Sequence, residues 1–376
     1  MEELAVFGGK PVREKPIFYG RQYIDQEDVE AVTKVLTADV ITSGPQVSDL
    51  EKHLCEITHA KYAVAVCNGT AALHLAALAA GFGEGDEVIV SSITFAASSN
   101  CVLYAGAKPV FADINPETYN IDPASIRKLI TPRTKAVVAV DFTGQAVELD
   151  EIREICKEHN LLLIEDAAHA IGTTYKGKPV GSLADMTCFS FHPVKTVTAG
   201  EGGAITTNNA ELAATIRALA NYGSQKKYVF KYCGRNSRLD EIQAAVLDVK
   251  LKYLVEDNAH RKEVGKYYIE NLNNSIVIQP DTLPYEQNVF HLFPILVGEG
   301  KRDALHDYLE QNGVGTVIHY PVAPHEQECY KKEGWNIPQL SFPIAEKIAD
   351  EELSLPIGPT ITLEEVKQII ELINKF

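Results

Sequence analysis

The chain has 376 residues, of which 45% are hydrophobic and 23% are charged, and its formal net charge is −16 at pH 7. This length and composition predict an ordinary globular protein with two or three domains and a large core. The strong negative charge argues against nucleic-acid binding, because phosphate backbones are held by clustered Lys and Arg side chains.

Several other classes of protein are disfavoured by simple patterns. The acidic start Met1-Glu2-Glu3 has no leader pattern, and the longest apolar stretch, 71–80, is too short to cross a bilayer. We therefore expect a cytoplasmic protein without a membrane partner. The seven cysteines form no C-x-x-C pair and the eleven histidines show no metal-ligand spacing, so we expect buried thiols and no metal site.

Short β-branched runs alternate with helical patterns between residues 62 and 207. We expect helices in the intervening segments, among them 71–80, which Gly81 ends, and 148–158. This alternation predicts an α/β fold with a mainly parallel sheet, in which ligands bind at the carboxyl ends of the strands. The expected strands are 62–66, 87–90, 108–111, 136–140, 161–164, 187–190 and 204–207.

The pattern changes after Arg238 to one long helical run, 239–272. Prolines and polar residues then indicate a connection to a second unit. We predict a large α/β domain at 1–250 and a smaller α+β domain at 251–376. We expect this unit to begin with the apolar segment 289–293 and to contain a strand at 314–319 and helices at 301–311 and 363–374.

A candidate phosphate site follows the first predicted strand. Asn68-Gly69-Thr70 comes after strand 62–66 and opens helix 71–80. A Gly-Thr pair at a helix N-terminus supplies N–H groups, a hydroxyl and the positive end of the helix dipole, which together bind phosphate. The structural alternative is that Thr70 simply caps the helix after a glycine turn.

A carboxylate is expected at the end of another buried strand. Glu165-Asp166-Ala167-Ala168-His169 follows strand 161–164, which leaves Asp166 at its carboxyl end. An unpaired buried carboxylate is costly, so Asp166 needs a cationic partner or a structural role as a helix cap. A protonated pyridine nitrogen, as in cofactors of the pyridoxal type, is one such partner.

Two ring-shaped side chains are candidates for the faces of such a cofactor. Phe95 follows strand 87–90 and a short polar turn, where it could stack on a flat ring. His169, three residues after Asp166, could cover the other face or hydrogen-bond a ring hydroxyl. A core phenylalanine and a structural histidine are the alternatives for each residue taken alone.

The most informative segment is 190–195, which runs from Ser190 to Lys195 and precedes the glycines of 200–203. A lysine amine becomes a nucleophile when desolvation lowers its pKa, and it then holds an aldehyde as a Schiff base. The glycines let another group approach the backbone closely. A surface lysine beside a glycine-rich turn is the alternative.

The motifs together supply every contact that pyridoxal 5′-phosphate requires. They provide a phosphate cradle, a partner for the ring nitrogen, a stacking side chain and an amine. We therefore predict a pyridoxal-phosphate site at the carboxyl edge of the sheet. The residues of this set are Gly69, Thr70, Ser190, Asp166, Phe95 and Lys195.

The chain resembles the DegT/DnrJ/EryC1/StrS sugar aminotransferases over nearly its whole length, from 19–25 to 353–356. The resemblance implies the type I aspartate-aminotransferase fold, pyridoxal phosphate as cofactor and a homodimer with shared active sites. In some relatives a histidine replaces the lysine and the enzyme is a dehydratase, so Lys195 disfavours that activity. The motifs that carry the resemblance are 68–74, 165–169, 190–195 and 200–203.

The resemblance also implies a role for each site residue. Lys195 forms the internal aldimine, Asp166 pairs with the ring nitrogen, and Asn236 reaches the cofactor phosphate of the neighbouring subunit. The residues implied around the ring are Phe95 and His169, those around the phosphate are Thr70, Ala71 and Ser190, and those near the substrate are His319, Tyr320 and His325.

The implied reaction is a transamination. L-glutamate gives its amino group to the cofactor, leaving pyridoxamine 5′-phosphate, and a keto sugar linked to a nucleotide diphosphate then accepts it. The amino sugar formed would enter glycan or polysaccharide biosynthesis, such as that of the O-antigen of lipopolysaccharide.

Two positions of amination are open. Segments 19–23, 93–98 and 191–195 resemble enzymes that aminate C4 of UDP-linked 4-keto-6-deoxy-N-acetylhexosamines. Segments 221–224, 236–241 and 318–321 resemble enzymes that aminate C3 of dTDP-linked 3-keto-6-deoxyhexoses. Those 3-keto enzymes often carry Gln in place of His169, and the prediction therefore favours C4.

Two further classes remain as alternatives. A non-catalytic regulator or sugar-nucleotide sensor on the same scaffold would bind ligand without turnover. A dinucleotide dehydrogenase needs G-x-G-x-x-G between a strand and a helix, whereas the glycines of 81–85 have the wrong spacing and follow a helix.

Overall fold

The computed structural model describes residues 16–279, 281, 286–331, 337 and 340–376. Its main feature is a seven-stranded sheet in the order β1-β9-β8-β5-β4-β2-β3. Six of these strands run in one direction and β9 alone is reversed, because β9 is antiparallel to both of its neighbours. The predicted, mainly parallel sheet is confirmed. The strands are β1 Tyr62–Val66, β2 Glu87–Ser91, β3 Lys108–Ala112, β4 Thr134–Val140, β5 Leu162–Asp166, β8 Met186–Ser190 and β9 Gly203–Thr207.

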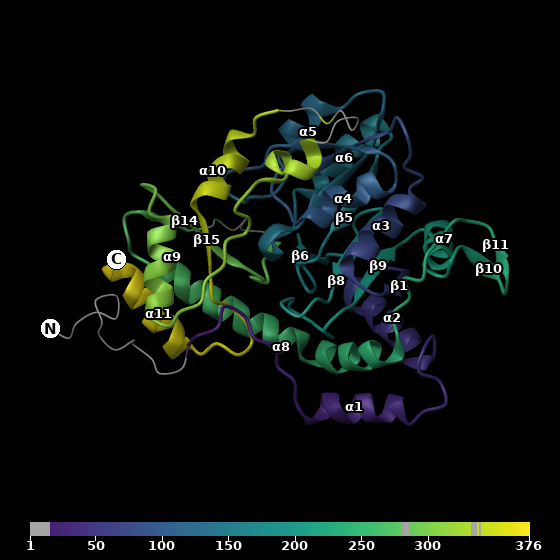
Figure 1. The fold of residues 1–376 in the computed structure, drawn as a ribbon, viewed down its shortest axis with the longest axis horizontal. Helices are drawn as coiled ribbons and strands as arrows, with labels where there is room; N and C mark the ends of the chain where they lie inside the picture. Colours follow the sequence, from purple (N-terminus) through teal and green to yellow (C-terminus); the bar gives the residue numbers. More distant parts are fainter. Residues whose placement is uncertain (1–15, 280, 282–285, 332–336, 338–339) are drawn as a thin grey trace.

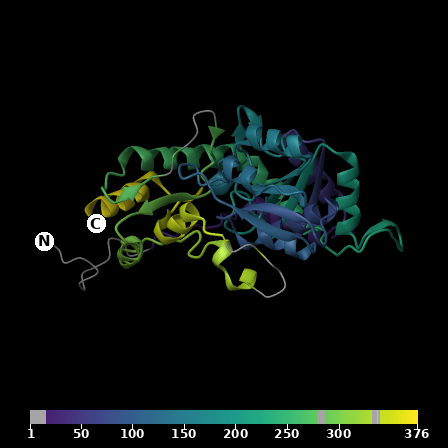
Figure 2. The same cartoon turned by 90° about the horizontal axis from the view of Figure 1, so that it is seen from above.

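Alternating side chains make both faces of this sheet hydrophobic. In β2, for example, Val88 and Val90 belong to one buried cluster and Ile89 to the other. Helices cover both faces, which gives three layers around two cores (Figures 1 and 2). One face carries α3 Gly69–Ala79, α4 Ala96–Tyr104, α7 Ala210–Ala220 and α10 Pro343–Glu351; the other carries α2 Pro45–Thr58, α5 Pro123–Leu129, α6 Leu149–His159 and the first half of α8 Glu241–Asn271.

A smaller antiparallel sheet lies at the other end of α8. Its strands are β12 Val277–Ile278, β14 Phe293–Val297 and β15 Glu352–Leu355. The second half of α8 packs on it together with α9 Arg302–Gln311 and α11 Leu363–Lys375. Because α8 is continuous from one unit to the other, the predicted division after residue 250 falls inside this helix and stays a prediction.

The structure differs from the sequence prediction at one strand of this unit. Segment 314–319 forms two isolated bridges instead of a strand. It is only partly buried, with Val314 inside and Val317 exposed, and a short apolar run of this kind does not by itself separate a connection from a strand. Residues 289–292, where the unit begins, are a buried connection, since Val289 and Leu292 donate their N–H groups to Gly144 and Thr143 beside the large sheet.

Two peripheral elements extend from the large unit (Figure 1). Helix α1 Gln26–Leu36 lies along α8, where Lys250 forms a buried ion pair with Asp28. The hairpin of β10 Ser224–Lys226 and β11 Val229–Phe230 projects beyond α7 and exposes Tyr228 and Phe230. The remaining elements are β6 Thr174–Tyr175, β7 Lys178–Pro179, β13 Glu286–Gln287 and the 3₁₀ turns Phe142–Gly144, Pro324–Glu326 and Glu328–Lys331.

None of the helices in the described part of the chain combines the length and the apolar composition that crossing a membrane requires.

Candidate active site

A cavity of about 670 Å³ opens at the carboxyl edge of the large sheet. The six parallel strands end there, so the residues that follow them are brought together although they are far apart in the sequence. The predicted motifs that line this cavity are Gly69 and Thr70 after β1, Phe95 after β2, Asp166 at the end of β5, His169 after it, Ser190 at the end of β8, and Lys195.

The N-terminus of α3 forms one wall of the cavity. Asn68 is the N-cap of this helix, and its Oδ1 accepts a hydrogen bond of 2.8 Å from the N–H of Ala71. Thr70 is therefore not the cap, and its hydroxyl is left for a ligand, while the first-turn N–H groups have no partner inside the helix. Ala71 itself does not line the cavity, and its N–H is already engaged by Asn68.

Glycine is required at two positions beside this wall. A Cβ on Gly69 would lie 2.7 Å from Cβ of Ser190 and 2.9 Å from its Oγ. A Cβ on Gly203 would lie 2.5 Å from the carbonyl carbon of Asn68. The glycine-rich segment 200–203 thus lets β9 approach β1, and Gly69 lets the Ser190 hydroxyl reach the helix N-terminus.

Replacement of Gly69 by alanine is expected to weaken pyridoxal phosphate binding by about tenfold or more, because overpacking of this kind costs about 1–3 kcal/mol. Titration of the protein with the cofactor, followed by absorbance, measures this change. Gly83→Ala is the matched control, since a Cβ there meets no atom within 4 Å. Equal cofactor affinity in the two variants would contradict the assigned role of Gly69.

Asp166 is held in place by hydroxyl and backbone donors. Its Oδ2 accepts a hydrogen bond of 2.6 Å from the Ser98 hydroxyl, and its Oδ1 accepts one of 3.2 Å from the N–H of Ala168. The Ser98 hydroxyl is itself 2.6 Å from Oγ1 of Thr94. Burial raises the pKa of Asp166, and the hydrogen bonds and the charge of Lys195 oppose that rise. A cationic ring nitrogen in the cavity would offset the cost of this buried carboxylate.

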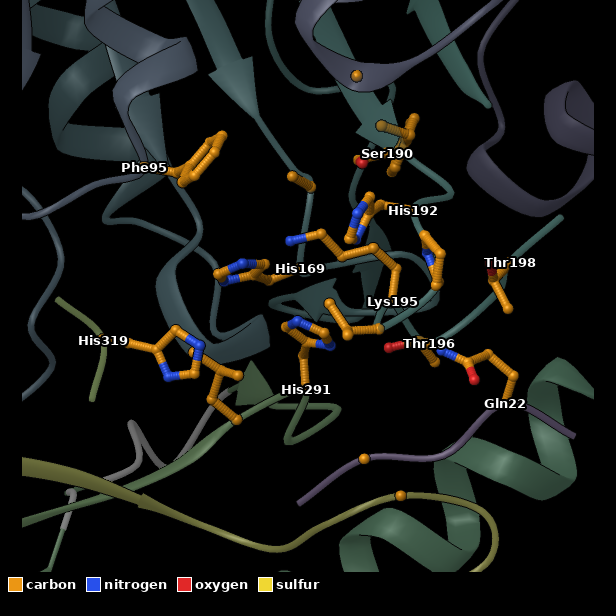
Figure 3. A pocket seen from close by; sticks show the side chains of 18 of the residues that line it. Gln22, Phe95, His169, Ser190, His192, Lys195, Thr196, Thr198, His291 and His319 are labelled. Carbon is orange, nitrogen blue, oxygen red and sulfur yellow. The ribbon is translucent and has the colours of Figure 1, made fainter. Parts of the chain in front are cut away.

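Lys195 is the amine of the site. It follows the turn that begins after β8, where its N–H donates to the carbonyl of His192 at 2.8 Å. Burial lowers the pKa of Lys195 to about 8, while the charge of Asp166 acts in the opposite direction. The side chain extends into an open space that Phe95 and His169 also face (Figure 3). At pH 7 about a tenth of this amine is therefore unprotonated and nucleophilic, far more than for an exposed lysine.

Two imidazole rings that contact each other at a tilt line one side of the cavity. The ring centroids of His169 and His291 are 4.3 Å apart with 37° between the planes (Figure 3). Burial lowers the pKa of both side chains well below the usual value, and the charge of Lys195 lowers them further. Both rings are therefore neutral, and they line the same cavity as Lys195. Sequence reasoning did not identify His291, because no motif surrounds it.

Phe95 lies at the opposite side of the same space. It precedes α4, and 60% of its surface is exposed at the mouth of the cavity. Its ring lies 6.1 Å from that of Tyr320. An exposed aromatic side chain in this position is available to stack on a ligand.

The predicted substrate residues divide into two groups. His319 and Tyr320, joined by a cis peptide bond, line the cavity. His325 does not: its ring packs between Phe111 and Phe342, and its Nε2 lies 3.2 Å from Glu346. This position is structural, and it gives no support to a substrate contact by His325.

Asn236 does not line the cavity of its own subunit, and its side chain is exposed. The expected contact from this residue to the cofactor phosphate of a neighbouring subunit therefore stays a prediction.

A buried arginine was not anticipated from the sequence. Arg261 of α8 lines the cavity, is only 3% exposed, and has an Nε with no hydrogen-bond partner among the described residues. Its Nη1 makes two long contacts, of 3.4 and 3.5 Å, with the carbonyl oxygens of Phe290 and His291. Burial lowers the pKa of Arg261 to about 10, so it remains charged and attracts anions into the cavity.

The residues at this edge fit pyridoxal phosphate. A cradle that a Cβ would fill, a buried carboxylate in need of a cation, a desolvated amine and two ring faces surround one cavity. The fold and this set of side chains define a pyridoxal-phosphate-dependent aminotransferase of fold type I.

Comparison with known proteins identifies the family. Residues 22–374 match the DegT/DnrJ/EryC1/StrS aminotransferase family, to which the chain belongs. A relative from Aneurinibacillus thermoaerophilus, named dTDP-3-amino-3,6-dideoxy-alpha-D-galactopyranose transaminase, is 44% identical over 93% of this chain and 95% of its own. A relative from Pseudomonas aeruginosa, named UDP-2-acetamido-2-deoxy-3-oxo-D-glucuronate aminotransferase, is 36% identical over 90% and 92%.

A solved structure supports the same family. The structure of Streptomyces venezuelae DesV in complex with a ketimine intermediate superimposes on this chain with a TM-score of 0.89. The two sequences are 37% identical, and the match covers 93% of this chain and 94% of the DesV chain. The chain is a pyridoxal 5′-phosphate-dependent nucleotide-sugar aminotransferase.

Proposed function

We propose that this enzyme transfers the amino group of L-glutamate to C3 of a nucleotide-linked keto sugar, with a dTDP-linked 3-keto-6-deoxyhexose as the first candidate. The observation that carries the proposal is the 44% identical relative, whose name places the amine at C3 of a dTDP-linked dideoxy sugar. The relative from Pseudomonas aeruginosa, whose name also places the keto group at position 3, supports the same position. The cationic Arg261 supports substrates that carry carboxylate or phosphate groups.

Each part of the site has a role in such a transfer. Pyridoxal phosphate, when bound, supplies an aldehyde that takes up an amino group and a ring that accepts electrons from a breaking C–H bond. The N-terminus of α3 and the Ser190 hydroxyl bind the phosphate. The Asp166 carboxylate holds a proton on the ring nitrogen. The His169 and His291 rings exclude water from one face.

Lys195 carries the proton transfer. Its amine, with a pKa of about 8, is basic enough to take a proton from Cα of the amino donor and acidic enough to return it to a neighbouring carbon. In the second half of the reaction the same amine moves the proton in the reverse sense at C3 of the sugar.

The position of amination is tested by product analysis. The purified enzyme is incubated with L-glutamate and either dTDP-3-keto or UDP-4-keto 6-deoxy sugars, and the products are identified by mass spectrometry and NMR. Amination at C3 is expected. Amination at C4 alone would instead support the second candidate, which His169 favours, and ligand binding without any turnover would indicate a regulator or sensor.

We also propose that the active enzyme is a homodimer in which each site takes Asn236 from the partner. The position of Asn236 outside its own cavity supports this arrangement. The apolar hairpin tip at 228–230, whose three side chains are 58–80% exposed, also supports it.

Mixed dimers test this arrangement. Asn236→Ala and Lys195→Ala homodimers are each expected to be impaired, whereas subunits of the two variants refolded together should regain activity. One site of the mixed dimer then holds an intact lysine and an intact asparagine. The gain is measured as turnover against the separate variants, and no gain, despite mixed dimers shown by mass spectrometry, would refute the shared site.

A further inference from the structure

A buried chain of polar groups lies directly behind His319. Glu352 and Ser354 occupy alternate positions of β15 and therefore point to the same side of the strand. Segment 317–319 runs beside them, since Val317 and Ser354 exchange two backbone hydrogen bonds. Glu352 is fully buried, and no Lys, Arg or His side chain among the described residues forms an ion pair with its carboxyl group.

The chain has three links. The backbone N–H of His319 donates to Oε2 of Glu352, and the hydroxyl of Ser354 is hydrogen-bonded to Oε1. Oγ of Ser354 also lies 2.9 Å from Nδ1 of the His319 ring. Nε2, the other ring nitrogen, has no hydrogen-bond partner among the described residues, and the ring lines the active-site cavity (Figure 3).

Counting the hydrogens shared by Glu352, Ser354 and the His319 ring gives one fully hydrogen-bonded arrangement for each charge state of Glu352. When Glu352 is ionised, Ser354 donates to Oε1 and must accept a hydrogen bond from Nδ1–H, which leaves a lone pair on Nε2. When Glu352 is protonated, its proton lies on Oε1, because Oε2 already accepts from His319 N–H. Oε1–H then donates to Ser354, Ser354 donates to Nδ1, and the imidazole proton is on Nε2.

We propose that Glu352 and Ser354 are positioning residues that set the tautomer of His319, so that His319 offers the substrate a donor when Glu352 is protonated and an acceptor when it is ionised. This role rests on the proposed function together with the predicted contact between His319 and the sugar. The two tautomers would favour different partners on that sugar: Nε2–H favours a carbonyl or ether oxygen, whereas the lone pair favours a hydroxyl.

The pKa values of Glu352 and His319 place the tautomer change near pH 8. Burial raises the pKa of Glu352 to about 8, and burial lowers the pKa of His319 to about 4. The carboxyl group is therefore protonated below about pH 8 and ionised above it, while the imidazole stays neutral and changes only its tautomer.

Other titratable groups face Glu352 from the elements around it. Arg302 of α9, whose Nη1 lies 3.5 Å from the carbonyl oxygen of Glu352, lowers the pKa of its carboxyl group. Burial raises the pKa values of three phenols near the carboxyl group, and the charge of Glu352 raises them further, so they remain neutral when it titrates; they are Tyr19, Tyr119 and Tyr320. Among these groups only Glu352 changes its charge near pH 8. On the cavity side of His319, Lys195 also has a pKa of about 8, and its charge lowers the pKa of His319. The variant Glu352→Gln keeps Lys195, so it separates the two titrations.

The tautomer is read directly by NMR. The full-length protein is labelled with ¹⁵N-histidine, and the ring signals of His319 are assigned by their absence from His319→Gln. In the wild type we expect the Nε2–H tautomer at about pH 6 and the Nδ1–H tautomer at about pH 10, two units on either side of the Glu352 pKa. This measurement requires neither cofactor nor sugar, so it is independent of whether the proposed function holds.

Glu352→Gln should hold His319 in one tautomer. Its amide oxygen accepts from His319 N–H, and its NH₂ group donates to Ser354, as protonated Glu352 does, so the Nε2–H tautomer is expected at every pH. Ser354→Ala breaks the chain of hydrogen bonds, so the His319 tautomer in this variant should no longer change when Glu352 titrates. Glu351→Gln, which alters the adjacent carboxylate that pairs with Lys347 at 3.7 Å, is the control and should behave as the wild type.

Kinetics separates this role from a merely structural one. Glu352→Gln should change kcat/KM for the keto sugar by about tenfold above pH 8, the size of one or two hydrogen bonds, and should leave the half-reaction with L-glutamate unchanged. The proposal is overturned if Glu352→Gln shows the same pH-dependent tautomer change as the wild type, or if the wild type keeps one tautomer throughout. If no keto sugar is aminated, the proposed function fails. The NMR result still shows whether Glu352 and Ser354 set the tautomer of His319.

Discussion

Replacement of Lys195 by alanine is expected to lower turnover by about 10⁴-fold or more. General acid–base catalysis contributes about 10²–10⁴-fold, and the variant also loses the covalent attachment of the cofactor. Borohydride reduction followed by mass spectrometry should link the cofactor to Lys195 in the wild type and to no residue in the variant. The visible absorbance of the bound cofactor should change accordingly.

The control for this result is Lys195→Arg, which keeps a cation near Asp166 but cannot form an imine. It should bind pyridoxal phosphate without a covalent link and should be as inactive as Lys195→Ala. Rescue of Lys195→Ala by a small added amine would confirm that a proton carrier is the missing group. Turnover of Lys195→Ala within tenfold of the wild type would exclude Lys195 as the catalytic amine.

Removal of the Asp166 carboxylate is expected to have the second largest effect. Breaking a buried charge pair costs about 3–5 kcal/mol, which corresponds to about two to three and a half orders of magnitude in rate for Asp166→Ala. The fold should persist, because the carboxylate lies at the end of β5 beside the cavity, and the Ser98 hydroxyl can pair instead with Thr94, whose Oγ1 lies 2.6 Å away. Steady-state kinetics and circular dichroism measure the two quantities.

Two variants separate charge from packing at this position. Asp166→Asn removes the charge, so it should lose nearly as much rate as Asp166→Ala. Because it keeps the shape and can still accept the hydrogen bond from Ser98, its Tm should hardly change. Ser98→Ala removes one donor, of 2.6 Å, and should lower the rate only about tenfold. If Asp166→Asn retained full activity, the charge would not be the functional property of this residue.

The large sheet and most of its residues at the active site could be predicted from sequence. Strands such as 62–66 and 136–140 are β-branched runs with clear ends, and α3 and α6 follow them as expected. Because parallel strands end at one edge, Asn68, Asp166 and Ser190 could be placed together once the strands were recognised. This inference needed only local patterns and one rule of topology.

The C-terminal unit was harder to predict for a physical reason. Segment 314–319 has the short apolar run of a strand, but in the structure it makes only two isolated bridges, with Val314 to Ile17 and Val317 to Ser354. His325 is a related case. A histidine in a polar loop resembles a substrate contact, but the fold buries it between Phe111 and Phe342.

The sequence by itself determined the chemistry of the site, since a lysine, an acid and a glycine-threonine turn each carry their function within a few adjacent residues. Only the tertiary structure decided which distant residues complete that site. The ring contact of His291 with His169, the guanidinium of Arg261 in the cavity and the chain from Glu352 through Ser354 to His319 all join separate elements. Such contacts depend on strand order and on how α8 and β15 meet the large sheet, which no local spacing of residues encodes.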